Sequence, residues 1–151
     1  MIHSSTMLMV ALLTSATIAY GQSGNLKMLV EGTWGRRAAM IVGGDPKAGS
    51  GNSAVYATLV NSGAEPDALI AATTNVAGSV EIHETYRDRD MMMMRPVRKI
   101  DIPANGKVQM KPGGYHIMLL DIKRDLKAGE TISVSLQFAK AGTIPVIAAI
   151  K

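Results

Sequence analysis

The spacing of apolar runs limits the fold of this chain more than any other feature of its sequence. After residue 24 there is no helical periodicity, and short apolar runs are bounded by Gly, Pro, Asn and Asp. Such runs, recurring about every ten residues, are typical of all-β domains. The sequence therefore predicts an all-β fold, either a Greek-key sandwich or a small barrel. The expected strands cover residues 27–34, 53–61, 68–73, 80–86, 92–100, 107–110, 114–122, 131–137 and 143–150.

Turn residues separate these expected strands. Asn105-Gly106, between two apolar runs, is the strongest signal for a short β-hairpin. Pro112-Gly113 suits the central pair of a type II turn. The Gly-rich segment 43–51 is not followed by a Walker pattern, so it is expected to be a flexible connection rather than a phosphate-binding loop.

The first 21 residues differ from the rest of the chain. Residues 7–19 form an uncharged apolar stretch that ends in Ala19-Tyr20-Gly21, a small-x-small cleavage pattern. This predicts a secretory signal peptide over residues 1–21 and one β-sandwich domain over residues 22–151. Because His3 is the only basic residue before the stretch, a buried first strand or helix is the alternative. No lipidation cysteine follows, so the exported protein is expected to have no membrane anchor.

Composition removes several classes of function. The net charge is +4 with scattered basic residues, and the aromatics are one Trp, one Phe and four Tyr. Nucleic-acid binding is therefore not expected, since it usually needs a clustered basic face with stacking aromatics. The chain has no cysteine, which removes both disulfides and thiolate metal ligands. The scarcity of aromatics also predicts a core of Val, Ile, Leu and Ala.

Two histidines and a run of methionines are the candidates for chemistry. Beyond the expected signal peptide the histidines are His83 and His116, and methionines occupy residues 91–94. Taken singly, a methionine more often fills a gap in a core, and a histidine is more often structural. Strand alternation makes their placement more specific, because residues i and i+2 share a face. His116 and Met118 are therefore expected on one strand face, and Glu81 and His83 on the outward face of another strand.

A hairpin is expected to bring His83 close to Met94. The charged segment 86–90 should form its tip, and a turn centred between Asp88 and Arg89 places His83 directly opposite Met94. Opposed side chains on antiparallel strands have Cβ atoms about 5 Å apart. Imidazole nitrogen and thioether sulfur form a soft ligand set that favours Cu(I), whereas Zn(II) sites use Cys, His or carboxylate.

The spacing of these residues resembles that of a known family, the periplasmic copper chaperones called PCuAC. The family pattern is a His, ten residues, a Met, twenty-one residues and His-x-Met, and here His83, Met94 and His116-Ile117-Met118 stand at those spacings. One departure is Thr85, where many members carry a Met two residues after the first His. Flanking sequences are similar as well, namely VEIHE at 80–84, MRPV at 94–97, KPGGYHIML at 111–119 and FAKAG at 138–142.

The resemblance implies a cupredoxin-like Greek-key β-sandwich that binds one Cu(I) through His83, Met94, His116 and Met118 outside the cytoplasm. It further implies that the copper is donated to apo copper proteins. The CuA site of a cytochrome c oxidase subunit and another copper chaperone are the partners that it points to.

Three other functions compete with this interpretation. An electron-transfer cupredoxin needs a cysteine ligand, and the chain has none. A zinc enzyme needs a general base beside an open metal position, but Glu84, next to His83, is expected on the opposite strand face. The protein is therefore not expected to be an enzyme. A non-catalytic exported sandwich for protein binding or adhesion, with the methionine run in its core, is the alternative.

Overall fold

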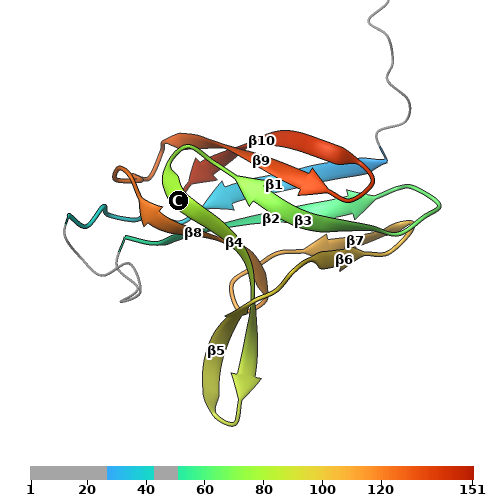
Figure 1. Ribbon diagram of the computed structural model, residues 1–151, viewed down its shortest axis with the longest axis horizontal. Helices are drawn as coiled ribbons and strands as arrows, with labels where there is room; N and C mark the ends of the chain where they lie inside the picture. The colour runs from blue at the N-terminus through green and yellow to red at the C-terminus, as the bar shows by residue number, and fades with distance from the viewer. Residues whose placement is uncertain (1–26, 43–50) are drawn as a thin grey trace, which may run out of the picture.

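The computed structural model describes residues 27–42 and 51–151, so the expected signal peptide and residues 43–50 of the expected flexible connection lie outside it. The described residues form ten β-strands and no helix, which confirms the all-β prediction (Figure 1). The strands are β1 (Met28–Gly35), β2 (Ser53–Asn61), β3 (Asp67–Thr73), β4 (Ala77–Asp88), β5 (Met91–Pro96), β6 (Ile100–Ile102), β7 (Gly106–Gln109), β8 (Tyr115–Ile122), β9 (Thr131–Phe138) and β10 (Gly142–Ile150).

The strands form one sheet that folds over into an open sandwich. Their order is β5-β4-β8-β2-β1-β10-β9-β3-β6, with β7 paired to β2. β1 joins the two halves, because it is antiparallel to β2 and its last residues run parallel to the end of β10. β3 lies close to β4, and β6 close to β2, although neither pair is adjacent in the sheet order. The two halves therefore face each other across a core.

The core consists mainly of aliphatic side chains, as the composition predicts. Leu59 of β2 and Leu119 of β8 are fully buried in one half, and Leu69 of β3 and Leu136 of β9 in the other. Along β9 (Thr131–Phe138) every second residue is buried, since successive side chains of a strand point to opposite faces. Burying one such Leu contributes about 1.5–3 kcal/mol to stability.

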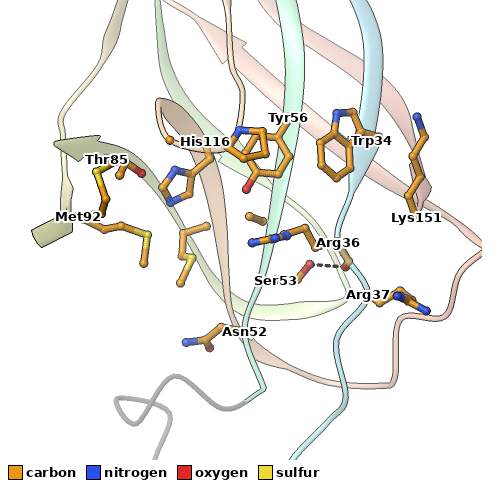
Figure 2. A pocket seen from close by; sticks show the side chains of 15 residues that line it. Trp34, Arg36, Arg37, Asn52, Ser53, Tyr56, Thr85, Met92, His116 and Lys151 are labelled. Carbon is orange, nitrogen blue, oxygen red and sulfur yellow. Dashed lines mark hydrogen bonds between the residues drawn. The ribbon is translucent and has the colours of Figure 1, made fainter. Parts of the chain in front are cut away.

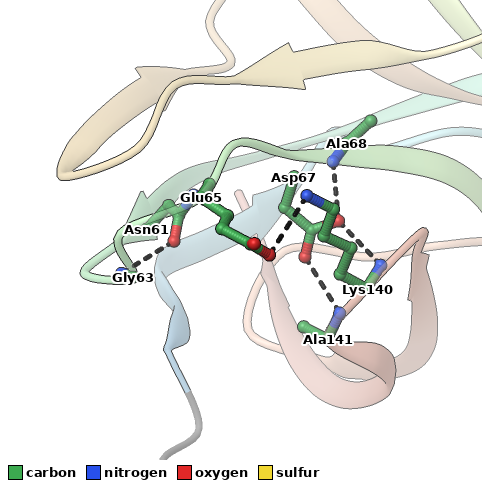
Figure 3. Close-up of polar contacts among 7 residues, drawn as sticks. All are labelled: Asn61, Gly63, Glu65, Asp67, Ala68, Lys140 and Ala141. Atoms are coloured by element: carbon green, nitrogen blue, oxygen red, sulfur yellow. Dashed lines mark hydrogen bonds and ion pairs between the residues drawn. The ribbon is translucent and has the colours of Figure 1, made fainter.

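A buried carboxylate fastens the turn between β9 and β10 to the start of β3 (Figure 3). Oδ1 of Asp67 accepts hydrogen bonds from the backbone N–H groups of Ala68 and Lys140, both at 2.8 Å. Oδ2 accepts a third from Ala141 at 2.9 Å. Hydrogen bonds from backbone donors to a carboxylate are charge-assisted and stronger than those between neutral groups. Asp67 therefore has a structural role.

β4 extends past β8 and forms with β5 a hairpin that projects from the sandwich (Figure 1). Residues 77–84 of β4 pair with β8, and residues 83–88 pair with β5. β5 is the terminal strand of the sheet order, and each of its residues is exposed. The β4–β5 hairpin is therefore held by one strand pairing rather than by core packing.

The expected strand over residues 92–100 is wrong, because two strands, β5 and β6, take its place. The segment stays beside β4 as far as Val97, whose N–H donates to the carbonyl of Ile82 at 2.8 Å. It then crosses to the other half of the sandwich, where Ile100 pairs with Leu69 of β3. Pro96 has no N–H to continue a ladder, and a proline is tolerated here because β5 is an edge strand.

The hairpin expected at Asn105-Gly106 is also wrong, although a turn does form there. The N–H of Gly106 donates to the carbonyl of Pro103 at 3.2 Å, and Asn105 has a φ of 50°. However, β6 pairs with β3 while β7 pairs with β2, so the turn carries the chain between the two halves. A turn signal identifies the reversal but not the partners of the strands beside it.

The turn expected at Pro112-Gly113 is present. The N–H of Gly114 donates to the carbonyl of Lys111 at 2.9 Å, and Gly113 has a φ of 84°. A positive φ at the third residue is the requirement of a type II turn and explains the glycine. β8 begins directly after this turn, which sets the position of His116.

Candidate metal centre

His116 is the most buried of the predicted metal ligands. It lies on β8, is 3% exposed, and its Nδ1 lies 3.2 Å from the carbonyl oxygen of Gly114. The carbonyl can only accept, so Nδ1 carries the proton and Nε2 of the neutral ring keeps its lone pair. Burial lowers the pKa of His116, the hydrogen bond to Gly114 opposes this, and the charges of His83 and Arg36 lower it further. A neutral imidazole with a free Nε2 is a metal ligand.

His83 lies directly opposite His116 in the antiparallel pairing of β4 with β8. The two ring centroids are 5.6 Å apart and the rings are tilted by 53°. Nε2 of His83 lies 2.7 Å from Oε2 of Glu81. Its Nδ1 is buried and has no hydrogen-bond partner among the described residues. Since an unpartnered buried acceptor is costly, Nδ1 is the atom of His83 that is available to a metal ion.

Glu81 is a residue that the sequence analysis placed correctly but gave no role. It shares the outward face of β4 with His83 and lies opposite Met118 of β8. A carboxylate that accepts the N–H of a ligating histidine fixes its tautomer and orientation. The i, i+2 spacing of Glu81 and His83 was the signal for this contact, because it puts both side chains on one strand face.

An open cleft of about 1100 Å³ gathers three of the four predicted ligands (Figure 2). Met94 comes from the β4–β5 hairpin, and His116 and Met118 come from β8. Thr85 and Met92 line the same end of the cleft. His83 does not line the cleft, but its ring lies next to that of His116, which does. The structure thus brings all four predicted residues into one region.

The predicted pairing of His83 with Met94 is wrong by two residues. His83 lies opposite Pro96, and Met94 lies opposite Thr85, because the turn is formed by Arg89 and Asp90. A shift of two preserves the strand face, so Met94 is still on the side of His83 but diagonal to it.

An ion pair accounts for the observed register of the hairpin. Arg95 lies opposite Glu84, with Nη2 of the arginine 2.5 Å from Oε1 of the glutamate. The guanidinium carbon of Arg95 also lies 4.7 Å from the ring centroid of Tyr86. In the predicted register Arg95 would instead face Ile82, a core residue. Cross-strand charge pairs of this kind stabilise one register over its alternatives.

The methionine run is not part of the core. Met91, Met92, Met93 and Met94 are 66%, 56%, 38% and 55% exposed. Met92 and Met94 line the cleft, whereas Met91 and Met93 do not, as strand alternation predicts. The alternative in which this run is buried structure is therefore wrong.

Sites for harder metals are not formed by the parts of the chain that the structure describes. No group of three His, Cys, Asp or Glu side chains is positioned there to hold an ion. Glu84, the candidate general base of a zinc enzyme, is instead paired with Arg95. The donors that do converge are imidazoles and thioethers, which suit Cu(I) better than Zn(II).

A family model described as "Putative lipoprotein LpqE-like" matches residues 28–150. "Putative lipoprotein Lxx21020" of Leifsonia xyli subsp. xyli (strain CTCB07) is 36% identical over 105 residues, which are 69% of this chain and 63% of that protein. A Rickettsia prowazekii (strain Madrid E) protein, RP573, is 37% identical over 58% of this chain and 49% of its own length. The chain thus spans between about half and two thirds of these relatives.

Two solved structures are similar over most of their length. The copper-bound PCuAC domain from PmoF2 has a TM-score of 0.64 and 28% identity, covering 83% of this chain and 92% of that one. The Cu(I) form of DR1885 from Deinococcus radiodurans has a TM-score of 0.60 and 30% identity, covering 88% and 85%. The sandwich is therefore that of the PCuAC domains. Within the described residues no helix could cross a membrane.

Proposed function

The chain belongs to the LpqE-like family, and from this premise we propose that it is a copper(I) chaperone that acts in the periplasm. It binds one Cu(I) through His83, Met94, His116 and Met118 and donates the ion to apo copper proteins. Two structural neighbours are described as copper-bound forms, which supports copper as the ion that this protein carries. The apolar stretch before Ala19-Tyr20-Gly21 supports export.

The observation that carries the proposal is the convergence of soft donors on one open cleft. Met94, His116 and Met118 line it, and His83 lies against His116 with a buried, unpartnered Nδ1. Imidazole nitrogen and thioether sulfur bind a metal as neutral donors, so the four ligands leave the single positive charge of Cu(I) unchanged. Zn(II) would gain neither a carboxylate nor a thiolate from this set, which disfavours it.

The placement of the ligands supports transfer rather than storage. Met94 is 55% exposed on a projecting edge strand, whereas His116 is buried on β8. An incoming ligand of an acceptor can displace the exposed thioether first and the imidazoles afterwards. Copper then passes by stepwise ligand exchange without release into solvent. The CuA site of cytochrome c oxidase and another copper chaperone are the acceptors that we propose.

Metal retention tests the function. The exported protein is loaded with Cu(I) or Zn(II) under reducing, metal-buffered conditions and then desalted. Native mass spectrometry measures how many metal ions each chain retains. The expected result is one retained copper per chain and loss of the zinc. Equal retention of the two metals contradicts the proposal.

Two methionine variants show whether retention depends on the proposed site. Met118→Ser removes a donor that lines the cleft, and Met40→Ser removes a thioether that does not line it. Met118→Ser should lose copper on the desalting column, and Met40→Ser should keep it. Circular dichroism of both variants checks that the sandwich remains folded.

A further inference from the structure

The cleft has a second half with a different chemistry. Beyond His116 it is lined by Trp34, Arg36, Arg37 and Lys151, which together are called here the basic half of the cleft (Figure 2). Among the described residues that line the cleft, three side chains are cationic and none is a carboxylate. A cleft lined by one sign of charge concentrates the field and attracts ligands of the other sign.

The cations of the basic half have no acidic partner in the described part of the chain. The four ion pairs of Lys or Arg with a carboxylate in that part of the chain all involve other residues. Nζ of Lys151 instead lies 5.7 Å from the ring centroid of Trp34. Arg36 is exposed and reaches toward His116 across the cleft (Figure 2).

An aromatic pair connects the two halves of the cleft. The ring centroids of Trp34 and Tyr56 are 4.6 Å apart, and those of Tyr56 and His116 are 6.2 Å apart. Tyr56 is buried, whereas Trp34 is partly exposed at the cleft surface. Trp, Tyr and Arg are the residues enriched at the centres of protein–protein interfaces. The basic half therefore combines unpaired charge with an aromatic surface.

We propose that the basic half of the cleft docks carboxylate side chains of the protein that receives the copper. This inference rests on the proposed function, because docking there places the acceptor over Met94 and Met118. The acceptor is a protein that carries Asp or Glu beside its own copper ligands. Bound Cu(I) adds one positive charge to the cleft and transfer removes it, so the loaded carrier attracts the acceptor more strongly than the empty one.

Two synthetic peptides that differ in charge test the docking. Both lack Met, His and Cys, and one carries four Asp where the other carries four Asn. Trp34 is the only tryptophan of the chain, so its fluorescence reports occupancy of the cleft. At low salt the copper-free protein should bind the Asp peptide about three- to tenfold more tightly, and this difference should vanish at high salt. Equal affinity for the two peptides at low salt overturns the inference.

A matched pair of double variants separates the local charges from the net charge. Arg36→Gln with Arg37→Gln removes two cations from the cleft, and Arg98→Gln with Lys107→Gln removes two exposed cations that do not line it. The first double variant should lose the preference for the Asp peptide, and the second should keep it. An equal loss in both would mean that only net charge matters, and would also overturn the inference.

Copper affinity distinguishes failure of this inference from failure of the proposed function. In a competition assay with a small Cu(I) chelator, the Arg36 and Arg37 double variant should bind copper within about twofold of the unaltered protein. If the unaltered protein binds no copper, the proposed function fails whatever the peptides do. If it binds copper but does not distinguish the peptides, only the docking inference fails.

Discussion

β8 and the β4–β5 hairpin supply donors to the same cleft from opposite environments. β8 is paired on both sides, by β2 and by β4, and its His116 is 3% exposed. β5 is the last strand of the sheet, and its Met94 is 55% exposed. Opening of the central strand therefore requires disruption of the sandwich, whereas opening of the hairpin requires loss of one strand pairing.

This difference assigns different tasks to the two regions under the proposed function. His116 and Met118 hold the ion at a position that the whole fold determines. Met94, and beside it Met92, control how the ion enters and leaves. The contrast predicts that substitution of a ligand on β8 abolishes copper binding. Substitutions on β5 should only weaken it, and more so for residues that line the cleft than for those that do not.

The largest effect is expected from His116→Gln. It removes a buried imidazole that no neighbouring donor can replace. Cu(I) affinity should therefore fall by more than about 100-fold, which exceeds the loss typical of residues that only support a ligand. A competition titration against one Cu(I) chelator measures it. If His116→Gln costs no more than Met92→Ser, the distinction between β8 and the hairpin is wrong.

The four methionines of β5 should differ from one another. Met94→Ser should weaken Cu(I) binding most of the four, by roughly 10- to 100-fold, which is the range for the loss of a residue that supports a metal site. Met92→Ser should weaken it less, since Met92 lines the cleft as a possible substitute donor. Met91→Ser should have a small effect and Met93→Ser hardly any, because these two do not line it. Equal losses in all four variants would instead indicate that any of the four thioethers can bind the copper.

Copper affinity should also fall in mildly acidic solution. Histidine must be neutral to ligate, and thioethers do not titrate. Because burial lowers the pKa of His116 below the usual range of an imidazole, protons compete for this ring only at a more acidic pH than for a free imidazole. A competition series from pH 7.5 to pH 5 should therefore be flat at first, and the copper affinity should then fall toward pH 5. A loss that begins well above pH 6.5, or no loss at all, contradicts this account of His116.

A smaller loss than that of His116→Gln is expected from Glu81→Gln. The amide keeps the shape of the side chain but accepts the His83 N–H less strongly, so Cu(I) affinity should fall by about tenfold. Glu65→Gln is the matched control, since its carboxylate contacts Lys140 far from the cleft. An unchanged affinity in Glu81→Gln, measured in the same competition assay, would show that Glu81 does not position His83.

The strands of this fold could be predicted more reliably than their partners. The boundaries of β2 (Ser53–Asn61) agree with the prediction, because alternation and turn residues are local signals. The register of the β4–β5 hairpin does not agree, since a pattern of period two is unchanged by a shift of two residues. The observed register is the one that places Glu84 opposite Arg95. A comparison of the possible registers for opposed charges would have identified it from the sequence.

The candidate site shows the same limit. Strand alternation put His116 with Met118 and Glu81 with His83. It could not put His83 against His116, because that pairing depends on β4 lying beside β8, more than thirty residues later in the chain. The basic half of the cleft was equally hidden, since Arg36 and Lys151 lie at distant places in the sequence and are joined only by the fold.

The most direct test of the central claim is the X-ray absorption spectrum of the Cu(I)-loaded protein. The account predicts a single Cu(I) species with two nitrogen and two sulfur neighbours, from His83, His116, Met94 and Met118. In the double variant Met92→Ser with Met94→Ser, which keeps both ligands on β8, the spectrum should lose one sulfur neighbour, whereas in Met93→Ser it should be unchanged. A first shell made of sulfur alone, or of nitrogen and oxygen alone, would contradict the proposed centre.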